Sequence, residues 1–133
     1  MVVAYGRTVL AVGIGSKADA LRELAVRVKV NNYGYEAAGS FKYENIDTLV
    51  SKWHLADMTE GKFIKGVKKI RPSIPVVAII DNNDEAQEKD ARSVGVTAVL
   101  TDDCDNEYLV SVVAQITGAD RITQLPAVTA NRN

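Results

Sequence analysis

The sequence predicts an α/β protein with a doubly wound parallel sheet, and three observations support this prediction. Short apolar runs rich in β-branched residues alternate with longer amphipathic stretches. The run Ile74–Ile80 is uninterrupted, as expected of a strand that helices cover on both faces of a parallel sheet. The 133 residues, 47% of them apolar, are enough for one domain with its own core. In such a sheet, ligands bind at the carboxyl ends of the strands, so we look for functional residues there.

The first third of the chain is predicted to hold two strands and one long helix. Residues 7–12 have the length and β-branched content of a buried strand. Ser16 is a suitable N-cap, and the residues after it predict a helix of about four turns. Its apolar face would consist of Ala20, Leu21, Leu24, Ala25 and Val28. Residues 31–34 would end this helix, and residues 35–38 would form a short second strand.

The stretch 41–57 fits either a helix or a strand. Its apolar residues are Ile46, Leu49, Val50, Trp53 and Leu55. Because a strand should precede the next helix, we predict a strand at 48–53, which leaves the second helix shortened. The next helix has Phe63, Ile64, Val67 and Ile70 on its apolar face and ends before Pro72.

The last part of the chain repeats the alternation. After Ile74–Ile80 we predict a charged helix at 85–94, stopped by Gly95, and a strand at 96–101. The last helix begins near Asp105, which is its predicted N-cap, and Asp84 is the predicted N-cap of the helix before it. Its apolar face would consist of Leu109, Val112, Val113 and Ile116.

Composition narrows the function without identifying it. The predicted domain spans residues 1–118, and residues 119–133 read as a polar tail or linker. Sixteen basic and 17 acidic residues provide no global field for nucleic acid or an anionic membrane. No apolar run approaches the roughly 20 residues of a membrane span, and the start has no secretory-signal pattern. A single cysteine, Cys104, permits no internal disulfide, so we expect a cytoplasmic protein.

The loop after the first strand carries a candidate phosphate-binding pattern. Gly13, Gly15 and Ser16 belong to a G-x-G-x-x-A sequence, which gives an alternative function: a small ligand- or nucleotide-binding α/β domain that uses Gly13–Lys17. The acid that should close the second strand is missing, because Glu36 would open that strand instead. A tight strand-to-helix turn is therefore the favoured interpretation.

Four acidic residues fall in predicted loops at the carboxyl edge of the sheet and form a candidate cation cluster. They are Asp57, Asp81, Asp102 and Asp103. Lys52 would neutralise part of this cluster, and solvated loop acids are the favoured interpretation. We expect no metal or other cofactor.

The remaining chemistry-bearing residues favour structural roles. The third long helix has a basic face, which indicates a solvated surface or a weak patch for an acidic partner. These basic residues are Lys62, Lys65, Lys68, Lys69 and Arg71. Trp53 next to His54 favours packing over recognition. His54 is the chain's one histidine and so excludes a multi-histidine metal site. Cys104 precedes a helix start, which favours a thiolate, but no base accompanies it, and we expect no enzyme activity.

The frame Ile74–Val77 and the step Gly95–Ala98 into the last strand resemble the receiver domains of bacterial two-component response regulators. The resemblance covers about residues 8–117. It implies a flavodoxin-like topology of five parallel strands in the order 2-1-3-4-5.

Receivers accept a phosphoryl group on an aspartate that ends the third strand, and acids after the first strand hold Mg²⁺. The resemblance places the acceptor on Lys52 and the metal-binding acids on Gly13 and Ile14. The hydroxyl, aromatic switch and lysine positions fall on Ile80, Val99 and Asp102. Each of these positions lacks the residue type that phosphoryl transfer needs.

This pattern implies a degenerate receiver, or pseudo-receiver, that signals by protein contact without phosphorylation. The resemblance implies a protein partner, such as a histidine kinase, an output domain or another signalling protein. The expected surface is residues 85–117, which would also serve a homodimer. Residues 106–117 contain no basic side chain, so a dimer held by crossed ion pairs on the last helix is not expected.

Overall fold

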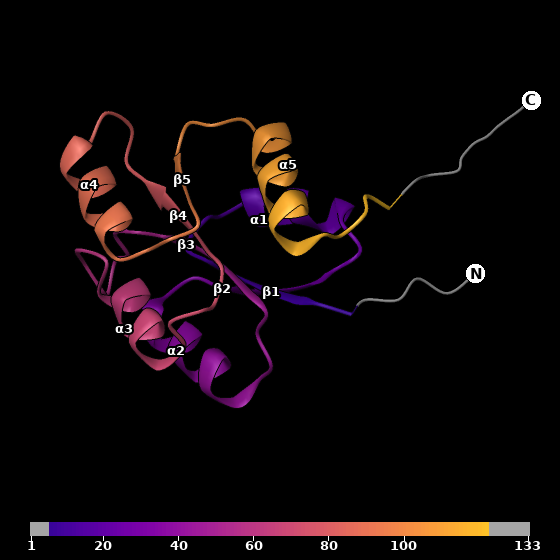
Figure 1. Ribbon diagram of the computed structural model, residues 1–133, viewed down its shortest axis with the longest axis horizontal. Helices are drawn as coiled ribbons and strands as arrows, with labels where there is room; N and C mark the ends of the chain where they lie inside the picture. Colours follow the sequence, from indigo (N-terminus) through magenta and orange to yellow (C-terminus); the bar gives the residue numbers. More distant parts are fainter. Residues whose placement is uncertain (1–5, 123–133) are drawn as a thin grey trace, which may run out of the picture.

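The apolar runs of the sequence form five parallel strands in one sheet (Figure 1). The structure is a computed structural model, and it describes residues 6–122. The strands are β1 (Thr8–Val12), β2 (Arg27–Asn31), β3 (Thr48–Lys52), β4 (Val76–Ile80) and β5 (Ala98–Thr101). They pair in the order β2-β1-β3-β4-β5, which confirms the predicted fold class and strand order.

Helices cover both faces of this sheet (Figure 1). They are α1 (Lys17–Ala20), continued by the 3-10 turn η1 (Leu21–Glu23), α2 (Gly34–Tyr43), α3 (Lys62–Ile70), α4 (Glu85–Ser93) and α5 (Asn106–Thr117). Because successive strand residues point to opposite faces, Leu10 and Val12 pack with α2, α3 and α4, whereas Val9 and Ala11 pack with α1 and α5. Within residues 6–122, no helix is long and apolar enough to cross a membrane.

The predicted long helix after Ser16 is wrong. The helix α1 has four residues, and β2 lies where the last turns of the helix were placed. Residues 26–30 read V-R-V-K-V, a strand alternation that prevails over the helical spacing because β2 pairs with β1 along its length. The backbone of Ser16 is helical and its side chain makes no capping hydrogen bond, so it does not cap α1 as predicted.

The predicted second strand at 35–38 and the shortened second helix are also wrong. These residues lie in α2, which has ten residues, and Glu36 lies exposed in its first turn. Ala37 and Phe41 give α2 an inward face at helical spacing. The shortened helix is therefore α1.

The second half of the chain follows the prediction closely. Strand β3 ends one residue before the predicted boundary, and α3, β4, α4, β5 and α5 form where expected. The side chains of Asp84 and Asp105 accept hydrogen bonds from the backbone N–H groups of Gln87 and Tyr108, so both predicted caps are confirmed.

Residues beyond the predicted domain boundary at 118 return to the domain. The Ala25 N–H donates to the Asp120 carbonyl at 2.9 Å, and Leu24 and Arg121 form an antiparallel bridge. The Arg121 guanidinium also pairs with Glu23 and Glu107. The packed domain thus extends to at least residue 122, and the rest of the predicted tail lies outside the described residues.

Candidate functional site at the carboxyl edge of the sheet

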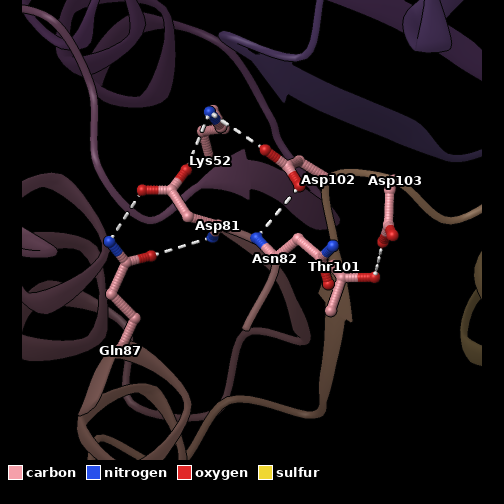
Figure 2. A network of polar contacts seen from close by, with 7 residues as sticks. All are labelled: Lys52, Asp81, Asn82, Gln87, Thr101, Asp102 and Asp103. Carbon is pink, nitrogen blue, oxygen red and sulfur yellow. Dashed lines mark hydrogen bonds and ion pairs between the residues drawn. The ribbon is translucent and has the colours of Figure 1, made fainter. Parts of the chain in front are cut away.

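A lysine ammonium group lies at the centre of the carboxyl edge. Lys52 ends β3, between β1 and β4, because the buried run before it pairs with both strands. Its Nζ lies 3.2 Å from Asp81 Oδ1, after β4, and 3.9 Å from Asp102 Oδ2, after β5 (Figure 2). Lys52 therefore lies where its charge can compensate those of Asp81 and Asp102, as expected.

Asp81 is held from a second side by Gln87 of α4 (Figure 2). The Gln87 Nε2 donates to Asp81 Oδ2 at 2.9 Å, and its Oε1 accepts from the Asp81 backbone N–H at 3.0 Å. The Gln87 hydrogen bond, followed by that of Lys52, holds the pKa of Asp81 below its usual value. Both carboxylate oxygens of Asp81 therefore have protein partners.

Asp102 and Asp103 are neighbours in the chain but have different partners (Figure 2). Asp102 Oδ1 accepts from the Asn82 backbone N–H at 3.1 Å, which joins the loops after β4 and β5. Asp103 accepts from the hydroxyl group of Thr101.

Asp57 has different partners from the other acids of the candidate cluster. It lies in the loop after β3 and contacts the start of α2. Its carboxylate accepts from the backbone N–H groups of Gly34 and Tyr35 at 2.8 and 3.0 Å, and these bonds lower its pKa. It therefore caps a helix from a loop 22 or 23 residues further along the chain. The candidate cluster of four acids is not assembled: among residues 6–122, no group of three or more histidine, cysteine or acidic residues is placed to hold a metal ion.

The loop after β1 has little room for a side chain at Gly13. Gly13 and Gly15 have left-handed conformations, with φ of +68° and +59°. A Cβ added to Gly13 would lie 2.5 Å from Cδ2 of Leu55, which is buried. Ile14 packs against the apolar cluster under α1 and α5. The two positions aligned with metal-binding acids thus carry no carboxylate, and Gly13 has no room for one without a shift of Leu55.

The candidate phosphate loop at Gly13, Gly15 and Ser16 opens onto a small hollow. Its volume is about 280 Å³, and its lining includes Lys17, Lys52 and Asp102. The Lys17 Nζ donates to the Cys104 carbonyl at 2.6 Å. Because α1 has a single turn and small-molecule sites usually exceed about 300 Å³, this geometry does not favour the nucleotide-binding alternative.

The remaining positions aligned with receiver residues are apolar. Ile80 ends β4 with 3% of its surface exposed, and it offers no hydroxyl group. Val99 is half-buried in β5 and packs on the α2–α4 side of the sheet. Ile80 thus lacks the hydroxyl group, and Val99 lacks the aromatic ring, that the resemblance to receivers implies for these two positions.

The structure buries Trp53, exposes His54 and leaves Cys104 half-buried. Trp53 is buried beneath Gly61, as the interpretation that favoured packing requires, and the Nζ of Lys65 lies 5.6 Å from the centre of its ring. His54 is exposed. Burial raises the pKa of the Cys104 thiol, which corrects the expectation that its position favours a thiolate.

Three residues of the network at the carboxyl edge were not among those predicted from the sequence, namely Asn82, Gln87 and Thr101 (Figure 2). Gln87 had a signal, because Asp84-x-x-Gln87 has the spacing of a capping box, which places the amide on the first turn of α4, although this amide accepts from the Asp81 N–H instead of the Asp84 N–H. Asn82 contributes a backbone N–H, for which the residue type gives no signal.

No protein-family model and no curated protein matches this chain. Solved structures do match. The CheY-like receiver domain protein of Methanospirillum hungatei JF-1 has a TM-score of 0.76 at 14% identity, over 84% of this chain and 94% of that chain. The chemotaxis response regulator CheY4 of Vibrio cholerae has a TM-score of 0.73 at 20% identity, over 83% and 98%. The BeF3-activated DrrB receiver domain has a TM-score of 0.74 at 18% identity, over 84% and 97%. The chain therefore has the fold of response-regulator receiver domains.

Proposed function

We propose that this chain is a pseudo-receiver, a signalling domain with the receiver fold that acts through protein contacts and without phosphoryl transfer. One observation carries the proposal: the ammonium group of Lys52 occupies the end of β3, 3.2 Å from Asp81. An ammonium group has no lone pair with which to attack phosphorus or to coordinate Mg²⁺. A domain with this residue at the acceptor position is not expected to be an enzyme or a phosphoryl acceptor.

The polarity of the site supports the same proposal. A receiver pairs an aspartate at the end of the third strand with a lysine at the end of the fifth, whereas here Lys52 follows β3 and Asp102 follows β5. The charges are exchanged between the two strands. A cation can thus hold the strand ends together without leaving an acidic site for a metal ion.

The surface that we propose for partner contact is formed by residues 85–117, comprising α4, β5 and α5. Strand β5 is at the edge of the sheet, so within residues 6–122 its outer backbone groups pair with no neighbouring strand. Tyr108 on α5 is 56% exposed, an aromatic group of the kind that interfaces favour. The partner is a histidine kinase, an output domain or another signalling protein, or a second copy of this chain.

Incubation with acetyl phosphate and Mg²⁺, followed by intact-mass measurement, tests phosphorylation independence. We expect no gain of a phosphoryl group, while the Vibrio cholerae CheY4 protein serves as the comparison under identical conditions. A stable phosphoryl adduct on this chain would refute the proposal, and its absence in Asp57→Asn or Asp81→Asn would identify the acceptor.

Sedimentation velocity tests whether the 85–117 surface forms a homodimer. The Tyr108→Ala variant should weaken self-association, whereas Tyr43→Ala, which removes a 79% exposed ring on α2, should not. Equal loss in both variants, or a monomer at all concentrations, would contradict a dimer through this surface.

A further inference from the structure

Helices α2 and α3 lie on the face of the sheet opposite α1 and α5 (Figure 1). Side chains of both helices line an apolar groove. Its volume is about 730 Å³. Phe41 and Met58 line it while only partly buried, and Ile70 at its end is 72% exposed. These side chains expose apolar surface in the groove, which suits an apolar group of a partner.

Gly66, in the middle of α3, lines this groove without a side chain. A Cβ added there would meet no atom within 4 Å, and the backbone is ordinary helix. Glycine destabilises a helix interior relative to alanine, and neither packing nor backbone conformation requires it here. The space above Gly66 is therefore available to a side chain from outside the molecule.

The rim of the groove is basic. Lys42, Lys62 and Arg71 line it, and its lining contains no acidic residue. None of the three forms an ion pair with a carboxylate in the described part of the chain. Arg71 has other partners, because its guanidinium lies 5.6 Å from the centre of the Phe41 ring and donates to the Ile46 carbonyl.

Two occupants from this chain fit the groove poorly. Residues 123–133 contain one arginine and no acid, so their charge has the sign of the rim. Helix α4, with Glu85, Glu88 and Asp90, carries no apolar residue larger than alanine within its bounds. If a second copy presented α4, its carboxylates would complement the basic rim, but it would offer no large apolar side chain to the apolar residues of the groove.

We propose that the α2–α3 groove binds an acidic amphipathic helix of a partner protein. The partner's apolar side chains at i, i+3 or i+4, and i+7 fill the groove above Gly66, and its carboxylates meet Lys42 and Lys62. The nine to ten residues of α3 and α2 make each about 15 Å long, which suits a partner helix of about three turns. This surface is separate from residues 85–117, and it requires nothing of Lys52.

The test is an NMR titration of the full chain with a synthetic amphipathic peptide of about 14 residues, with leucines at i, i+3 and i+7 and glutamates on both flanks. We expect saturable amide shifts in α2, in residues 58–71 and at few other positions. A peptide with lysine for glutamate, and a peptide with serine for leucine, should each bind at least tenfold more weakly.

Matched variants make the test specific for the groove. Gly66→Leu fills the groove and should weaken peptide binding at least tenfold. Gly39→Leu is the control, because Gly39 lies in α2, has no atom within 4 Å of an added Cβ and does not line the groove. The amide spectra of both variants report whether the fold is intact. Lys62→Glu should weaken binding and reduce its dependence on salt.

Three outcomes would overturn the proposal. They are equal binding of the lysine peptide, amide shifts that lie outside the groove, and an unchanged affinity of Gly66→Leu. Binding to vesicles that contain an anionic phospholipid, without binding to the acidic peptide, would assign the groove to a membrane instead. The phosphorylation experiment is independent of all of these outcomes.

Discussion

The carboxyl edge of the sheet and the α2–α3 groove both carry lysine side chains, but the surroundings of these lysines differ. At the edge, Lys52 has Asp81 and Asp102 within ion-pair distance. At the groove, Lys42 and Lys62 have no such partner among residues 6–122. The ion pairs at the edge compensate its charges, whereas the groove leaves basic and apolar side chains without such compensation. The surface available for contact therefore lies on the α2–α3 face more than at the edge.

One segment, residues 53–61, joins the two regions. It leaves β3 after Lys52 and brings Asp57 to the start of α2 and Met58 to the groove. The Gly61 N–H donates to the Trp53 carbonyl at 3.0 Å, which closes the segment on itself. Changes in this segment should affect both regions together.

The largest effect is expected from Gly61→Ala. Gly61 has φ of +73°, and a Cβ would lie 2.2 Å from the ring of the buried Trp53, so we expect a loss of about 3 kcal/mol in the free energy of unfolding. Gly15→Ala, at φ of +59° with no atom nearby, is the matched control and should lose about 1 kcal/mol. Urea denaturation measures both values, and similar losses would mean that segment 53–61 is not held by Trp53.

A smaller effect is expected when the cation is removed from the edge. Lys52→Met leaves Asp81 and Asp102 without it, and we expect a loss of about 1 kcal/mol because the three side chains are 29–42% exposed and screened by water. Adding Asp102→Asn to this variant should restore part of the stability, and high salt should reduce the difference. A variant as stable as the parent chain at low salt would show that the ion pairs do not hold the edge.

Alanine in place of the helical glycines Gly66 and Gly39 should stabilise the domain. Gly66→Ala and Gly39→Ala should each raise the free energy of unfolding by about 0.5–1 kcal/mol, because alanine favours the helix and fits without a contact. If Gly66→Ala destabilised the domain while Gly39→Ala did not, the groove would be packed more tightly than described.

The smallest effect concerns acid pH. The pKa values of Asp81 and Asp57 are lowered in the folded state, by Gln87 and Lys52 and by two backbone N–H groups respectively. Their contribution is present above the unfolded pKa of about 4 and is lost as the pH falls through the lowered folded values. Thermal unfolding from pH 6 downwards should show a shallower acid decline for Asp57→Asn and Asp81→Asn. An unchanged decline in both variants would contradict these contributions.

The fold could be predicted from the second half of the sequence because its signals are local. Runs such as Ile74–Ile80 and the caps Asp84 and Asp105 act within a few residues. The first third failed where two periodicities overlapped, and pairing with β1 decided for β2. The residues around β2 do not by themselves indicate that β1 will be its neighbouring strand.

The candidate site was predictable in its positions and less so in its contacts. The resemblance to receiver domains placed Lys52 at the end of the third strand and Asp102 after the fifth, and the topology brings both to one edge. The role of Asp57 depends on N–H groups more than 20 residues away, and a residue-type pattern does not contain that pairing.

The central claim is that the ion pairs of Lys52 occupy the carboxyl edge in place of a phosphoryl-transfer site. The most direct measurement is an amide NMR titration with Mg²⁺ and beryllofluoride, a mimic of the phosphoryl group. We predict no saturable shift at Gly13, Lys52, Asp81 or Asp102. Saturable shifts at these residues that require both components would show that the edge still holds a phosphoryl group and a metal ion, and would contradict the account.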